Sequence, residues 1–192
     1  MKLALLVLIT TISINSWAQL IDSSIYKKMP YTNLYAGSGA LVMNINYTAV
    51  KKIRLALEKS TGSILKNRGE AHITVITPPE FQNSLGLILS SKEIHQLAKK
   101  RIQDAKFSVI CIGEGKAQIG AKWEKTYFLV VESNDLINLR HEIYSEYLQK
   151  GGDAKLFDPD QYHPHITIGF TKKDLHPHQG VVKNVTSCRD DQ

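Results

Sequence analysis

The sequence predicts an α+β fold made of two pseudo-symmetric strand–helix–strand lobes, with facing antiparallel sheets around a central cleft and helices outside. The tripeptide His-Ile-Thr occurs twice, at 72–74 and 165–167, each time in a short run of β-branched residues that favours an extended strand. A strand-like stretch and a helical stretch precede each copy, and the two histidines are 93 residues apart. This repeated order indicates a duplicated unit whose helices cover the aliphatic sides of the strands.

The first eighteen residues have the pattern of a secretory signal peptide. Lys2 is followed by an apolar run over 3–14, and serine, tryptophan and alanine at 16–18 form a small-x-small cleavage site. The run is short for a membrane span, although an uncleaved N-terminal anchor is the alternative. We therefore expect residues 1–18 to be removed, leaving a secreted or periplasmic protein with no membrane association. The mature chain is predicted to be one domain over 19–192, with lobe one at about 36–105, lobe two at about 106–170 and a C-terminal tail at 171–192.

The elements of lobe one can be placed by periodicity and by their boundary residues. Residues 19–35 have mixed polarity and predict an irregular lead-in, and 40–46 is strand-like. The elements expected next are a helix capped by Thr48 and ended by Gly62, the first motif strand at 71–77 with prolines after it, and a helix behind the capping box of Ser90 and Glu93.

Lobe two repeats this order after an extra strand. Residues 107–112 predict that strand, 113–120 is rich in turn residues, and 121–132 is strand-like again. The expected remainder is a helix capped by Asn134 and ended by Gly151 and Gly152, a polar loop at 153–161, the second motif strand at 162–170 and a polar tail.

Charge and cysteine content exclude few classes of function and do not decide whether the two cysteines form a disulfide. The chain has a formal net charge of +6 and a pI near 9.2, so it tolerates or attracts polyanions. No basic stripe interleaved with aromatic residues is present, so the sequence does not indicate an extended nucleic-acid interface. Cys111 and Cys188 either form one disulfide in an oxidising compartment or leave Cys111 as a small buried residue of its strand.

The two tripeptides carry the candidate chemistry. Side chains alternate between the faces of a strand, so each motif offers a histidine and a threonine on one face and aliphatic residues on the other. Two imidazoles on opposite sides of one cavity can divide the work of phosphoryl transfer, with one as base and the other as acid. Threonine hydroxyls beside them can donate hydrogen bonds to phosphoryl oxygens. A strained cyclic phosphate needs no metal for this reaction. The bland alternative is a pair of core histidines beside core threonines.

These motifs resemble those of the 2H phosphoesterase superfamily, the ligase and cyclic phosphodiesterase group. The stretch HPHITIGF is similar to the second motif of that group, and the tail TKKDLHPHQGVVKN resembles its Swiss-army-knife branch. The resemblance implies a phosphoric diester hydrolase that needs no metal or other cofactor and acts on 2′,3′-cyclic phosphates or related phosphodiesters of nucleotides or short RNA. It assigns His72 and His165 as the catalytic acid–base pair and Thr74 and Thr167 as phosphate ligands. We expect a monomer.

Two other functions remain alternatives. A metal-dependent hydrolase is the first, because His163 and His165 have the same-face spacing of a chelating pair and His176 and His178 offer another. The second is a non-catalytic nucleotide- or RNA-binding module that kept the cleft without turnover. Four aromatic residues are candidates for stacking on a base, namely Tyr35, Trp123, Tyr127 and Tyr162.

Overall fold

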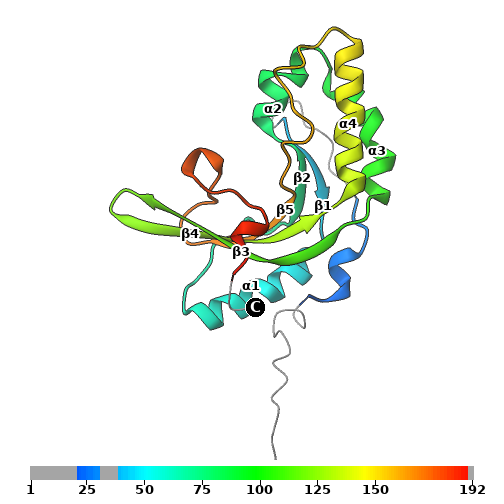
Figure 1. The fold of residues 1–192 in the computed structure, drawn as a ribbon. Coiled ribbons are helices and arrows are strands. Elements are labelled where there is room, and N and C mark those ends of the chain that lie inside the picture. Colours follow the sequence, from blue (N-terminus) through cyan, green and yellow to red (C-terminus); the bar gives the residue numbers. More distant parts are fainter. Residues whose placement is uncertain (1–20, 31–38, 190–192) are drawn as a thin grey trace, which may run out of the picture.

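The structure, a computed structural model, describes residues 21–30 and 39–189. The predicted signal peptide at 1–18 and the predicted stacking residue Tyr35 lie outside the described residues. The α+β class is confirmed (Figure 1). The helices and strands are β1 (Leu41–Asn44), α1 (Tyr47–Thr61), β2 (His72–Ile76), α2 (Pro78–Asn83), α3 (Ser91–Asp104), β3 (Ser108–Ile119), β4 (Lys122–Glu132), α4 (Asn134–Gln149) and β5 (His165–Phe170). Short 3-10 turns lie at Ser23–Tyr26, Leu85–Leu87, Pro177–Gln179 and Val185–Ser187.

The five strands form one antiparallel sheet in the order β1-β2-β5-β4-β3. The two motif strands, β2 and β5, are neighbours at its centre and are joined at the pair Ile73–Ile166. The halves therefore share a continuous sheet instead of presenting two separate facing sheets as expected. Figure 1 shows β1 and β2 standing upright, while the long β3–β4 hairpin runs across them. Joining the halves satisfies backbone groups that two free central edges would have exposed.

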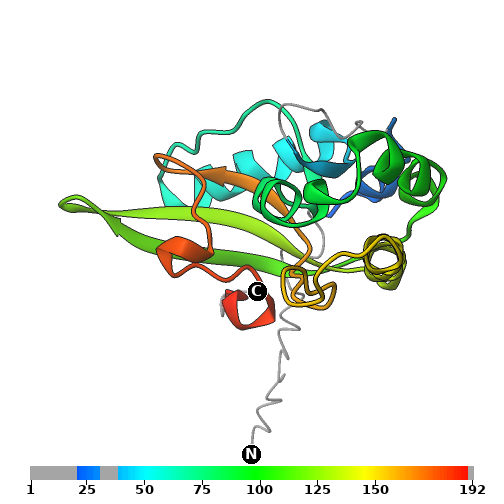
Figure 2. The ribbon, with the colours of Figure 1, turned by 90° about the horizontal axis from the view of Figure 1, so that it is seen from above.

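The helix of each half packs against the motif strand of the other half. Helix α1, which follows β1, contacts β5, and α4, which follows β4, contacts β2. One apolar side of α1 and one of α4 are buried in a single core with the aliphatic residues of both motif strands. Helices α3 and α4 lie side by side in both views (Figures 1 and 2). Because each helix packs on the motif strand of the other half, both halves together fix the position of each predicted histidine.

Some of the predicted helix boundaries are confirmed, and two predicted N-caps are one or two residues too late. The N-cap of α1 is Asn46, whose side chain accepts from the amide of Thr48, so the predicted Thr48 cap is wrong. The N-cap of α4 is Ser133 and not the predicted Asn134. In both cases two capping residue types stand within two positions of each other, and the chain path selects the earlier one. The confirmed boundaries are the left-handed Gly62 after α1 and the capping box of Ser90 and Glu93 before α3.

Two segments differ from their predicted conformations. The segment 113–120, predicted as turn-rich, continues β3 almost to its end, and the chain turns only at Gly120, which has φ 67°. Its glycines serve packing, since a Cβ at Gly113 would lie 2.3 Å from the ring of Phe128. The prolines after β2 do not only stop the strand: they begin the short helix α2, which Thr77 caps.

The C-terminal segment folds onto the sheet. Cys111 in β3 and Cys188 form a disulfide, and the amide of Arg189 donates to the carbonyl of Ile112. Leu175 and Val181 are buried against β3. Figures 1 and 2 show α1 and this segment on opposite sides of the β3–β4 hairpin. Among the described helices, none has the length and apolar character needed to cross a membrane.

Candidate functional site

The alternation predicted for the two motif strands is present in the structure. Each strand turns one row of side chains into the core and leaves the other row half-buried on the opposite face. The core row is fully buried and consists of Ile73, Val75, Ile166 and Ile168. The half-buried row consists of the four predicted site residues, His72, Thr74, His165 and Thr167. The sheet therefore gathers these four side chains on one face.

The register of the motif strands sets how the four residues lie relative to one another. In an antiparallel pair centred on Ile73 and Ile166, Thr167 is opposite His72, and Thr74 is opposite His165. The two histidines are then diagonal neighbours, a relation in which side chains on one face remain within reach of each other. Each half contributes one histidine and one threonine to this arrangement, as a pseudo-twofold axis between β2 and β5 requires.

A small pocket with a cavity volume of about 40 Å³ lies at this face. His72 and Thr167 line it, together with Asp174 and Arg68, whereas His165 and Thr74 are not among its lining residues. The ring of His165 instead packs edge-on against Phe128, with the ring centres 6.1 Å apart. Its Nδ1 lies 2.8 Å from the carbonyl oxygen of His163. Because a carbonyl oxygen only accepts, Nδ1 carries the hydrogen and the neutral ring keeps its lone pair on Nε2.

A buried polar network lies behind Thr167. Asp174 accepts hydrogen bonds from the hydroxyls of Thr167 at 3.1 Å and Thr126 at 2.7 Å. Its Oδ1 also accepts a hydrogen bond from the ammonium of Lys183 at 2.7 Å. The Lys183 side chain is only 3% exposed. Burial alone raises the pKa of the Asp174 carboxyl, but Lys183 and Thr126 outweigh it and hold that pKa below its ordinary value. The pair is therefore ionised on both sides, as a buried salt bridge with additional donors allows.

Both predicted catalytic histidines have lowered pKa values. Burial is the main cause for His165 and lowers its pKa to about 3, with the charge of Lys183 and the neighbouring His72 ring acting in the same direction. Burial also lowers the pKa of His72 from its ordinary 6.5, aided by Arg68 and Lys183. The carboxylate of Glu70, 3.8 Å from Nδ1 of His72, opposes this shift. Both imidazoles are thus neutral at pH 7 before an anion enters the site.

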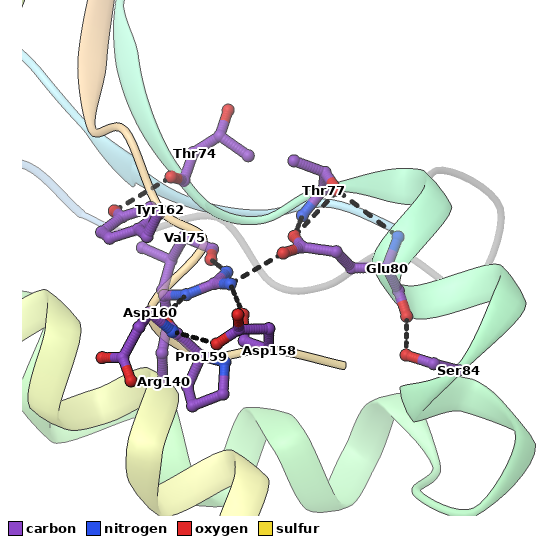
Figure 3. A network of polar contacts seen from close by, with 10 residues as sticks. All are labelled: Thr74, Val75, Thr77, Glu80, Ser84, Arg140, Asp158, Pro159, Asp160 and Tyr162. Carbon is purple, nitrogen blue, oxygen red and sulfur yellow. Dashed lines mark hydrogen bonds and ion pairs between the residues drawn. The ribbon is translucent and has the colours of Figure 1, made fainter. Parts of the chain in front are cut away.

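Arg140 of α4 holds the segment that leads into β5. Its guanidinium is buried between the rings of Phe157 and Tyr162, at 4.8 and 4.6 Å from their centres. It donates to the carbonyl of Val75 at the end of β2 and to the carboxylate of Glu80 in α2, each within 2.8 Å (Figure 3). It also donates to the carbonyl oxygens of Asp158 and Pro159 in the segment before β5.

Tyr162 extends this network toward the site. Its hydroxyl donates to the backbone carbonyl of Thr74 at 3.0 Å, so the segment before His165 is hydrogen-bonded to the strand that carries His72 (Figure 3). Within the part of the chain that the structure describes, the hydrogen bonds of Arg140 and Tyr162 reach none of the four predicted site side chains. They fix the backbone from which those side chains project.

The remaining predicted residues fall outside the pocket. His163 is exposed and contributes only its carbonyl oxygen, to His165. His176 and His178 stack on each other with ring centres 5.9 Å apart. Over the described ranges, no group of three or more His, Cys, Asp or Glu side chains is arranged to hold a metal ion. Of the predicted stacking residues, Tyr127 is buried in the core, Tyr162 is held by Arg140, and Trp123 is 65% exposed near the turn of the hairpin.

Sequence reasoning missed several polar residues of the site region. Arg140 left a usable signal, because it lies four residues after Leu136 and three before Ile143, on the apolar side of its helix. No such signal exists for Asp174 and Lys183, because a polar tail after the last strand is ordinarily solvated. Thr126 and Arg68 also read as unremarkable polar positions in a strand and a loop.

Comparison with known proteins gives one match. A protein-family model described as "Swiss Army Knife, 2H phosphoesterase domain" matches residues 39–176, which include both motif strands and Asp174. No curated protein and no solved structure matches the chain.

Proposed function

The chain belongs to the Swiss Army Knife 2H phosphoesterase family and carries a phosphoesterase domain; from this premise we propose that it hydrolyses a 2′,3′-cyclic phosphate or a related nucleotide or RNA phosphodiester without a metal ion. The observation that carries this proposal is the gathering of one histidine and one threonine from each half of the molecule on one face of two paired strands. Two imidazoles and two hydroxyls supply the proton transfers and the phosphate contacts that such a hydrolysis needs.

We assign His165 as the general base. Its Nδ1 hydrogen is bound to the carbonyl of His163, which leaves the Nε2 lone pair to accept a proton from water. The oxygen of that water attacks phosphorus while the bond between phosphorus and a ribose oxygen breaks. A pKa of about 3 makes the free ring a weak base. An anionic phosphate in the site raises the pKa of the ring, because it stabilises the imidazolium that forms.

We assign His72 as the general acid. The nearby Glu70 carboxylate favours its protonated form, and this ring lines the pocket, where it can donate a proton to the departing ribose oxygen. Thr74 and Thr167 are proposed to hold the non-bridging phosphoryl oxygens. Thr167 must turn its hydroxyl hydrogen away from Asp174 to do so, while Thr126 and Lys183 continue to compensate that carboxylate.

The proposed compartment is extracellular or periplasmic. The disulfide between Cys111 and Cys188 supports it, because such bonds persist in oxidising environments. The predicted signal peptide at 1–18 points the same way. The proposed substrate is accordingly a nucleotide or short RNA fragment outside the cytoplasm, and the proposed acting form is a monomer.

The test is product formation from nucleoside 2′,3′-cyclic phosphates with excess chelator present. We expect turnover by the wild-type chain, and loss of at least about 100-fold in kcat for His72→Ala and for His165→Ala with the circular dichroism unchanged. His141→Ala, which removes an exposed histidine of α4, is the matched control and should keep the wild-type rate. Loss of activity on chelation would establish the metal-dependent alternative, and binding without product would establish the non-catalytic one.

A nitrophenyl phosphodiester separates the two histidine roles. Nitrophenolate leaves without being protonated, so the acid is no longer needed for this substrate. His72→Ala should then recover most of its activity, while His165→Ala should stay inactive. The reverse pattern would exchange the two assignments. Thr74→Ala and Thr167→Ala should each cost about 2 to 4 kcal/mol in transition-state stabilisation with either substrate.

A further inference from the structure

The C-terminal segment brings Lys183 into the site region from outside the two motif strands. Lys183 lies beyond the stretch 39–176 that the family model matches. On one side of it, Val181 packs directly on the backbone of β3, since a Cβ at Gly115 would lie 2.3 Å from the Val181 side chain. On the other side, the disulfide at Cys188 holds the segment on the same strand. Two anchors therefore fix the backbone of Lys183 on the sheet.

The buried ammonium of Lys183 lies close to both motif residues of β5. It is 5.6 Å from the centre of the Phe128 ring, and His165 packs edge-on against the same ring. It also donates to Oδ1 of Asp174, whose Oδ2 accepts from the Thr167 hydroxyl. Thr167 and His165 are two residues apart on one face of the strand, a spacing of about 7 Å. Lys183 thus reaches this motif in two ways, through a shared ring and through a shared carboxylate.

A phosphate that enters the pocket meets Asp174, which lines it beside His72 and Thr167. An ionised carboxylate repels an anion and also holds the single hydrogen that the Thr167 hydroxyl can offer to it. Lys183 opposes both effects, because a buried cation neutralises the carboxylate where water screens little. We propose that Lys183 is a positioning residue for the reaction. It neutralises Asp174, so that Thr167 can bind the phosphate, and its charge keeps the ring of His165 unprotonated.

The charges around the two imidazoles give this role a pH signature. Burial is the main cause of the lowered pKa of His165. Among its charged and titratable neighbours, Lys183 and His72 lower that pKa further, whereas Asp174 raises it. The pKa of His72 is also lowered mainly by burial. Its charged neighbours are Glu70, Arg68, Asp174 and Lys183. Removing the Lys183 charge should raise both pKa values, because a nearby cation disfavours an imidazolium.

The kinetic test, which rests on the proposed function for its substrate, follows kcat/KM against pH at a temperature where all variants are folded. In Lys183→Met both limbs should move to higher pH, since the base must be unprotonated and the acid protonated. The maximum of kcat/KM should also fall at least about tenfold, because Thr167 contributes less to the phosphate. Limbs that stay in place would overturn the positioning role and leave Lys183 as a structural residue.

Two further variants separate the charge from the stability of the fold. Ile102→Ala, in the buried side of α3, is the matched control, because it destabilises the core without changing a charge and should keep both limbs in place. Lys183→Met/Asp174→Leu serves if Lys183→Met does not fold, since it leaves no unpaired charge in the core. Its acid limb should still move to higher pH, because Lys183 affects His165 more strongly than Asp174 does. An acid limb at the wild-type position would contradict the inference.

A binding measurement keeps the inference independent of turnover. Calorimetric titration with adenosine 3′-monophosphate should give at least about tenfold weaker binding for Lys183→Met than for the wild-type chain, and Lys183→Met/Asp174→Leu should recover most of the affinity. A chain that hydrolyses no phosphodiester but shows this pattern would overturn the proposed reaction and keep the role of Lys183 in anion binding. Equal affinities of the wild-type chain and Lys183→Met would overturn that role, whatever the chain hydrolyses.

Discussion

The hydroxyl of Thr167 in β5 donates a hydrogen bond to Oδ2 of Asp174, 3.1 Å away in the segment that follows the strand. This contact joins a motif residue to a carboxylate that also accepts hydrogen bonds from Thr126 and from the buried Lys183. The hydroxyl has a single hydrogen, so a phosphate bound at Thr167 must compete with Asp174 for it. When Thr167 turns, Asp174 keeps the hydrogen bonds from its other two donors. The loss of the Thr167 hydrogen bond therefore leaves no unpaired buried charge and costs little free energy.

The pH dependence of kcat/KM should reflect the lowered pKa values of the free histidines. A general acid must be protonated, so the rate falls as pH rises through the pKa of His72, which lies below its ordinary 6.5. A general base must be unprotonated, so the rate falls as pH falls through the pKa of His165, about 3. We expect the maximum of kcat/KM between these values, on the acid side of 6.5.

Steady-state kinetics over this pH range check the expectation. Glu70→Gln removes the carboxylate that raises the pKa of His72, so its alkaline limb should move to lower pH while the acid limb stays in place. An alkaline limb at or above 6.5 in the wild-type chain would contradict the assignment. The optimum of kcat should lie at higher pH than that of kcat/KM, since bound phosphate stabilises both imidazolium forms.

Removing one member of the Lys183–Asp174 pair should destabilise the fold strongly. Lys183→Met leaves the Asp174 carboxylate buried without its cation, which typically costs about 3 to 5 kcal/mol of unfolding free energy. The double variant Lys183→Met/Asp174→Leu removes both charges and should lose less than Lys183→Met alone. Urea unfolding measures these values. Lys52→Met, which breaks the exposed pair with Asp22, is the control and should cost less than about 1 kcal/mol.

Arg140 should matter for the position of both motif strands as well as for stability. Arg140→Met leaves a carboxylate of Glu80 and three backbone carbonyl oxygens without their donor, a loss of about 3 kcal/mol or more. Under conditions where this variant is still folded, kcat should fall, because the Tyr162 ring loses the guanidinium that packs on it and its hydrogen bond to the carbonyl of Thr74 is less firmly held. Arg101→Met on α3 is the matched control, with a partly exposed partner in Glu142 and a cost below about 1 kcal/mol. A wild-type kcat in Arg140→Met would show that the network is only structural.

The disulfide should stabilise the fold through the segment that carries Asp174 and Lys183. Cys111 and Cys188 are separated by 77 residues, and closing a loop of that length contributes roughly 4 kcal/mol in the chain-entropy model. Reduction should lower the unfolding free energy by up to this amount and reduce activity before global unfolding, because the segment loses its covalent anchor beside β3. The variant Cys111→Ala/Cys188→Ala should behave like the reduced chain and should not respond to reductant. Equal activity of oxidised and reduced chains would show that packing alone holds the segment.

The local pattern of the sequence was enough to place the motif strands and most helices. Alternation of β-branched residues around His72 and His165 gave both strands and the faces of their side chains, because side-chain direction in a strand follows from backbone geometry alone. The capping box of Ser90 and Glu93 likewise acts within four residues. Signals of this range can be read from neighbouring residues without any knowledge of the fold.

The sequence by itself determined that two histidines and two threonines lie on the outward faces of two strands, and that these strands belong to repeated units. The tertiary structure decided that β2 and β5 pair in one sheet, that Arg140 is buried against both, and that Asp174 and Lys183 lie beside Thr167. The reason is physical: these contacts join residues that are distant along the chain, and their stability comes from the desolvation and pairing of polar groups that occur only when the whole core is assembled.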